Sequence, residues 1–67
     1  MRHEAKGLLQ TLIRSISEDI EVVEGQAIEN ATIDPAVSPI LFTVEKNLIS
    51  LRESLVRLLE EIERLET

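Results

Sequence analysis

In the second half of the chain, apolar residues recur at alternating steps of three and four residues. The alternation continues without interruption from residue 41 to residue 65. It is the heptad pattern of a helix that buries one apolar stripe against another helix, with apolar residues at heptad positions a and d. The a positions are Leu41, Leu48, Leu55 and Ile62, and the d positions are Val44, Leu51, Leu58 and Leu65.

The first half of the chain has a heptad pattern of its own, which predicts a helix over about residues 4–30. Two dipeptides follow it, Asp34-Pro35 and Ser38-Pro39, and each places a helix-capping residue before a proline. Proline suits the first turn of a helix and disfavours helix in the residue before it. We therefore predict a connector over residues 31–38 and a second helix over about residues 39–65, capped by Ser38. The apolar stripe of the first helix consists of Leu9, Ile13, Ile16, Ile20, Val23 and Ala27.

Two helices of similar length joined by a short connector predict an all-α fold, an antiparallel two-helix hairpin that forms a single domain over residues 1–67. A chain of this size can bury only roughly 60% of its unfolded surface. It has no cysteine, so no disulfide can compensate, and small scaffolds of this kind commonly gain core by forming oligomers. Asn30 falls on the next d position after Val23, where it either fixes the register or ends the first helix.

Both helices carry more apolar surface than a two-helix contact requires. In the second helix the apolar arc widens over positions b and e, and in the first helix it widens over positions g and c. A broad arc is typical of a bundle of more than two helices, so we predict a dimer of hairpins, a four-helix bundle. Glu45 and Arg52 lie within this arc and either pair across a two-fold axis or extend to water at its rim. The predicted interface residues are Leu8, Leu12, Phe42, Glu45, Ile49, Arg52, Val56 and Leu59.

The charge balance narrows the range of partners. Seven basic and thirteen acidic residues give a formal net charge of −6, which repels phosphate backbones and anionic lipid headgroups. We therefore expect no binding to nucleic acid or membranes. No apolar run approaches the roughly 18 residues of a membrane span, and the first residues do not resemble a secretory signal, so we expect a cytoplasmic protein.

Candidate catalytic or metal-binding groups are few. His3 is the only histidine, and no cysteine or second histidine accompanies it as a metal ligand. Two Glu-x-x-Glu pairs, Glu18 with Glu21 and Glu60 with Glu63, have the spacing of carboxylates that hold Mg²⁺ in helical nucleotide pyrophosphohydrolases. All four fall on b and f positions, mostly away from the stripe, whereas metal sites in bundles need carboxylates that project inward. We therefore expect a solvated acidic surface, no cofactor and no metal.

Three hypotheses of function follow from these patterns. The first is a non-enzymatic interaction protein, a homodimeric helical bundle that acts as an adaptor, regulator or assembly factor. The second is a subunit or chaperone-like partner that buries its apolar flank in a different protein. The third is a metal-dependent hydrolase that uses the Glu-x-x-Glu pairs.

Overall fold

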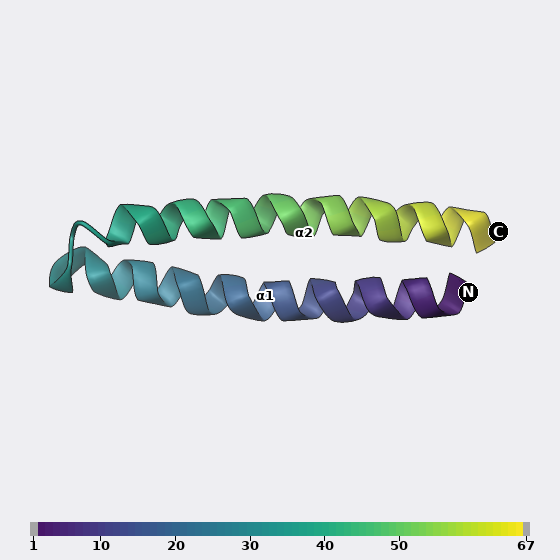
Figure 1. The fold of residues 1–67 in the computed structure, drawn as a ribbon, viewed down its shortest axis with the longest axis horizontal. Coiled ribbons are helices and arrows are strands. Elements are labelled where there is room, and N and C mark those ends of the chain that lie inside the picture. The colour runs from purple at the N-terminus through teal and green to yellow at the C-terminus, as the bar shows by residue number, and fades with distance from the viewer. Residues whose placement is uncertain (1, 67) are drawn as a thin grey trace.

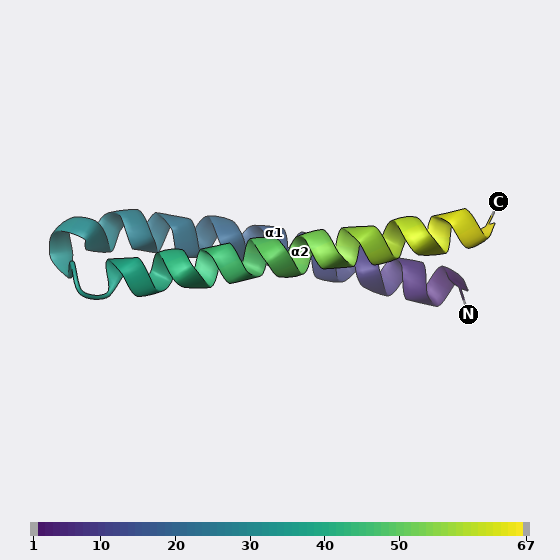
Figure 2. The same cartoon turned by 90° about the horizontal axis from the view of Figure 1, so that it is seen from above.

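The computed structural model describes residues 2–66, and within them the chain forms two α-helices joined by a short turn. Helix α1 spans Arg2–Ile33 and helix α2 spans Ser38–Glu66. The helices run antiparallel for their whole length, with the turn at one end and both chain ends at the other (Figure 1). They cross at a shallow angle near the middle of the molecule (Figure 2). The predicted antiparallel hairpin is confirmed.

Helix α1 continues further than the sequence pattern predicts. The amide of Asp34 donates a 2.8 Å hydrogen bond to the carbonyl oxygen of Asn30, which closes the last turn after Ile33. Asn30 therefore does not end the helix, and its side-chain amide donates to the carbonyl oxygen of Gln26 at 2.8 Å. The connector consists of residues 34–37, shorter than the predicted 31–38.

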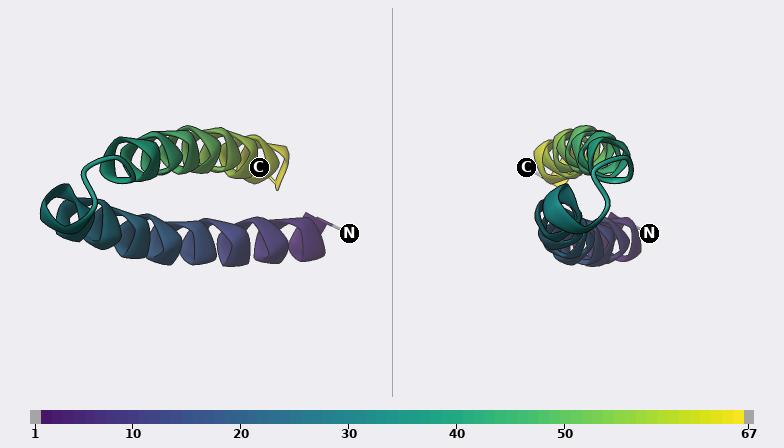
Figure 3. Two further views of the ribbon diagram at one scale, coloured as in Figure 1. Left: turned by 60° about the vertical axis from the view of Figure 1, so that its left-hand side comes forward. Right: turned by 90° about the vertical axis from the view of Figure 1, so that its left-hand side faces the viewer.

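The turn is anchored to α1 by Ser38. This residue begins α2, but its hydroxyl does not cap the helix: Oγ donates a 2.7 Å hydrogen bond to the carbonyl oxygen of Ala27. Ser38 is 5% exposed and Ala27 is fully buried, because the small alanine side chain lets the turn approach α1 closely. The amides of Val37 and Ser38 both donate to the carbonyl oxygen of Asp34, at 3.0 and 3.3 Å. The turn therefore has a defined conformation at the end of the hairpin (Figure 3).

The two helices use their apolar stripes differently. Helix α1 turns the predicted stripe toward α2, with Ile20 and Ala27 buried and the other members half-buried. Helix α2 turns its a and e positions toward α1, and its b positions Ile49 and Val56 are half-buried as well. Its d positions are 39–60% exposed, so the prediction that they lie in the hairpin contact is wrong. The apolar arc of α2 runs from d through a and e to b, and one neighbouring helix covers only part of an arc this wide.

The contact between the helices buries few side chains. Among the described residues, no large side chain is fully buried, and the buried hydrophobic residues are Ile20 and Ala27 alone. The accessible surface is 4974 Å², whereas a compact monomer of 7.6 kDa exposes about 4,300 Å² by the usual scaling with mass. The hairpin by itself therefore leaves more surface exposed than a compact protein of its mass.

Candidate functional site

The eight residues predicted to form an intermolecular interface divide into two groups. Leu8, Leu12 and Phe42 are exposed in the hairpin. The other five are half-buried: Glu45, Ile49, Arg52, Val56 and Leu59. The first group is available to a partner, whereas the second already contributes to the contact between α1 and α2.

Arg52 and Glu45 both have polar neighbours on α1. The guanidinium Nη1 of Arg52 donates to the hydroxyl of Ser17 at 3.2 Å, and that hydroxyl donates to the carbonyl oxygen of Ile13 at 2.8 Å. The carboxyl group of Glu45 faces that of Glu24. A side-chain hydrogen bond with Glu24, partial burial and repulsion between the two charges raise the pKa of Glu45 above its ordinary value. Both residues thus have roles within the hairpin.

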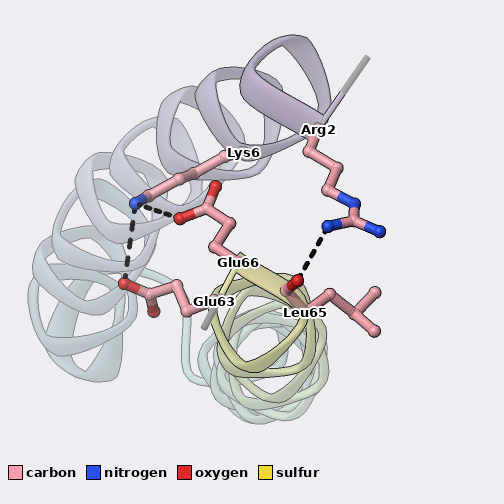
Figure 4. Close-up of polar contacts among 5 residues, drawn as sticks. All are labelled: Arg2, Lys6, Glu63, Leu65 and Glu66. Carbon is pink, nitrogen blue, oxygen red and sulfur yellow. Dashed lines mark hydrogen bonds and ion pairs between the residues drawn. The ribbon is translucent and has the colours of Figure 1, made fainter.

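At the end of the hairpin opposite the turn, polar contacts show which side chains lie on which side of the molecule. Lys6 Nζ lies 3.4 Å from Glu66 Oε2 and 3.9 Å from Glu63 Oε2. Arg2 Nη1 donates to the carbonyl oxygen of Leu65 at 2.7 Å. Figure 4 shows Lys6 and Glu63 on one side of the helix pair, and Arg2 with the Leu65 side chain on the other.

The side marked by Leu65 continues along α2 as an uninterrupted apolar row. Leu58, Leu51 and Val44 precede Leu65 at intervals of seven residues, which is two helical turns, so all four side chains lie on the same side of α2. Each of the four is exposed in the hairpin. This row is the set of d positions that the contact with α1 leaves uncovered.

Helix α1 adds three exposed apolar residues to the same side. Leu9 is half-buried and lies two turns after Arg2, so it lies on the same side of α1 as Arg2. The exposed residues Leu8 and Leu12 lie next to Leu9, further round the helix and away from Lys6. Val22 lies four turns after Leu8 on the same flank. We call the combined surface the open face. It consists of Leu8, Leu12 and Val22 of α1 and Val44, Leu51, Leu58 and Leu65 of α2.

The other exposed large hydrophobic residues lie elsewhere. Ile28 of α1 and Phe42 of α2 are both at b positions, on the side of the hairpin opposite the open face. Ile33 and Ile40 lie beside the turn. The open face is therefore the one side of the hairpin along which exposed apolar residues extend for most of its length.

Charge is distributed unevenly along the hairpin. The half that contains the turn, residues 18–50, holds seven acidic residues and one basic residue, a formal net charge of −6. The half that contains the chain ends holds six acidic and six basic residues and is neutral overall. Sequence reasoning used only the net charge and missed this division, which is visible once the chain is folded in two at residue 34.

Residues 2–66 contain neither a candidate metal site nor a pocket. Within residues 2–66, no three His, Cys, Asp or Glu side chains form a group that could hold a metal ion. The same part of the chain encloses no pocket. Of the two predicted Glu-x-x-Glu pairs, the second contributes Glu63 to the contact with Lys6. No helix within the described range is long and apolar enough to span a membrane.

Comparisons with protein-family models, with curated proteins and with solved structures gave no match.

Proposed function

We propose that this chain is a non-enzymatic protein-interaction module that works as a homodimer, with the open faces of two hairpins packed together as a four-helix bundle. A bundle of this kind serves as an adaptor, regulator or assembly factor, and presents its acidic outer surface to other proteins. The observation that carries the proposal is the open face itself, seven exposed aliphatic side chains along one side of a hairpin.

The small number of buried residues in one hairpin supports association with a second hairpin. Leucine and valine side chains on the open face remain in contact with water in a single hairpin, and contiguous apolar patches of this kind mark interaction surfaces in native proteins. A second layer of helices removes them from water and provides the core that one layer lacks. Association thus supplies stability that 67 residues without a disulfide otherwise lack.

The size of the face is adequate for a stable dimer. The hairpin is 50 Å long, and two helices of about 10 Å diameter make the face about 20 Å wide, or about 1,000 Å² in projection. A standard protein interface buries about 800 Å² on each partner. A second copy has a face of the same length and the same apolar character, so its area matches that of the row and its neighbours on α1.

Charge substitution on the open face tests the proposal. Leu58→Glu places a carboxylate in the proposed interface, where burial without a partner is costly, and it should convert the dimer to a monomer. Ile28→Glu is the matched control, because Ile28 is as exposed as Leu58 but lies on the opposite side. The two variants are compared by light scattering coupled to gel filtration. The proposal fails if both variants keep the mass of the unmodified protein, or if both lose it.

A different outcome would favour the second hypothesis, a subunit of a mixed complex. If the unmodified protein is a monomer at every concentration and still exposes the open face, the face belongs to a different protein. The same Leu58→Glu and Ile28→Glu pair then distinguishes specific partners from non-specific ones in a binding assay.

A further inference from the structure

We propose that the two hairpins pack antiparallel, with their turns at opposite ends of the bundle, so that α2 lies on α2 of the second copy and α1 on α1. This inference rests on the proposed homodimer and specifies its geometry. Two arrangements bring the open faces of two identical hairpins together. One is the proposed antiparallel arrangement. In the alternative arrangement, both turns lie at the same end of the bundle, and α1 of each copy lies on α2 of its partner.

The pattern of apolar residues is compatible with an antiparallel arrangement centred on Leu51. The Arg52–Ser17 hydrogen bond fixes residues 52 and 17 at the same level of the hairpin, near its middle. A two-fold axis at that level places Leu51 against its own counterpart and Leu58 against Val44 of the second copy. On α1 the same axis places Leu12 against Val22 of the second copy, since the two are equally distant from residue 17.

The charge of the two halves separates the two arrangements. With both turns at one end, two segments of charge −6 lie side by side, while the neutral halves share the other end. With the turns at opposite ends, each acidic half lies beside a half that contains six basic residues. Because charges within about 8 Å interact appreciably at physiological ionic strength, repulsion between the acidic halves disfavours the first arrangement.

Asp19 provides a second, independent reason. It lies on the flank of α1 that borders the open face, seven residues after Leu12, and it is exposed in the hairpin. With the turns at the same end, Asp19 lies against Leu51 of the second copy, where a carboxylate loses water without gaining a partner. With the turns at opposite ends, Asp19 lies near Ser15 of the second copy, whose hydroxyl is a hydrogen-bond donor.

The distance between the two turns in a dimer tests this geometry. The chain has no cysteine, so Ala36→Cys in the exposed turn gives a single site for a spin label. Pulsed electron spin resonance should give a distance near the 50 Å length of the hairpin. A distance below about 30 Å, the width of two helix layers plus the labels, would overturn the antiparallel arrangement and leave the homodimer intact.

A second label separates failure of the geometry from failure of the dimer. Ser50→Cys lies on α2 near the middle of the hairpin, so it gives a short intermolecular distance, below about 35 Å, in either arrangement. A short Ser50 distance together with a long Ala36 distance supports the inference. If neither site gives an intermolecular distance, the proposed homodimer itself is refuted, and this geometry with it.

Discussion

Replacing Leu51 with alanine is the sharpest quantitative test of the open face. Leu51 is one of the two inner residues of the exposed row on α2, and it is 48% exposed in the hairpin. In the proposed dimer that exposed half is removed from water, whereas the other half is already covered by the hairpin. The substitution should therefore weaken dimerisation by an amount that the exposed fraction determines.

The magnitude follows from the lost apolar surface. Leucine to alanine removes three carbon atoms, each contributing about 0.8 kcal/mol when fully buried, so the 48% that the dimer newly covers corresponds to about 1 kcal/mol for each copy. The substitution is present in both copies, which makes the loss about 2 kcal/mol for each dimer. That is a rise of roughly 30-fold in the dimer dissociation constant.

Sedimentation equilibrium over a dilution series measures this constant for Leu51→Ala and for the unmodified protein. Ile28→Ala is the matched control, because Ile28 is 59% exposed but lies on the opposite side of the hairpin. The control should change the dissociation constant by no more than about twofold, because surface substitutions outside a packed contact usually change a free energy by less than about 0.5 kcal/mol. Equal effects of the two substitutions, or no effect of Leu51→Ala, would refute the assignment of the open face.

Three further substitutions test the hairpin itself by thermal unfolding. Glu45→Gln should raise the melting temperature at pH 7. The raised pKa of Glu45 beside Glu24 means that this carboxyl group binds its proton more tightly in the folded state than in the unfolded state, so its contribution to stability becomes more favourable as the pH falls from neutral toward 4.5. The advantage of the variant should therefore shrink as the pH falls from neutral toward 4.5 and be absent below pH 4.5, and a constant advantage at all pH values would contradict the explanation. Ser38→Ala removes the buried hydrogen bond to Ala27 and should cost about 1 kcal/mol, a fall of about 4–8 °C in the melting temperature; an unchanged melting temperature would mean that this bond does not anchor the turn. Gly25→Ala should stabilise α1 by about 1 kcal/mol, because a Cβ atom there meets nothing within 4 Å; destabilisation would show that the glycine serves another purpose.

The hairpin was predictable because its determinants are local in the sequence. Two heptad patterns and two prolines within five residues specify two helices and the place where the chain reverses. The helix ends were less predictable. Asparagine is common at helix ends, yet α1 continues past Asn30 to Ile33 because the Asp34 amide completes another turn. Ser38 was identified as the start of α2. The acceptor of its hydroxyl hydrogen bond, the Ala27 carbonyl oxygen, was not predictable because it depends on how the turn folds back on α1.

The rotation of α2 could not be read from the sequence. Its apolar arc includes positions d, a, e and b, and several helix orientations bury a comparable amount of it. The structure turns a and e toward α1, with Arg52 bonded to Ser17, and leaves Val44, Leu51, Leu58 and Leu65 exposed. The prediction of excess apolar surface on α2 was therefore useful, but the exposed surface lies mainly on the d side, whereas the b and e side was expected. On α1, Leu8 and Leu12 lie on the exposed flank that the sequence indicated.

The mass of the unmodified protein in solution tests the central claim most directly. Sedimentation equilibrium over a wide range of concentrations should give twice the chain mass of 7.6 kDa, with dissociation on dilution and a melting temperature that rises with protein concentration. A folded species of 7.6 kDa at every concentration, with a melting temperature independent of concentration, would contradict the homodimer.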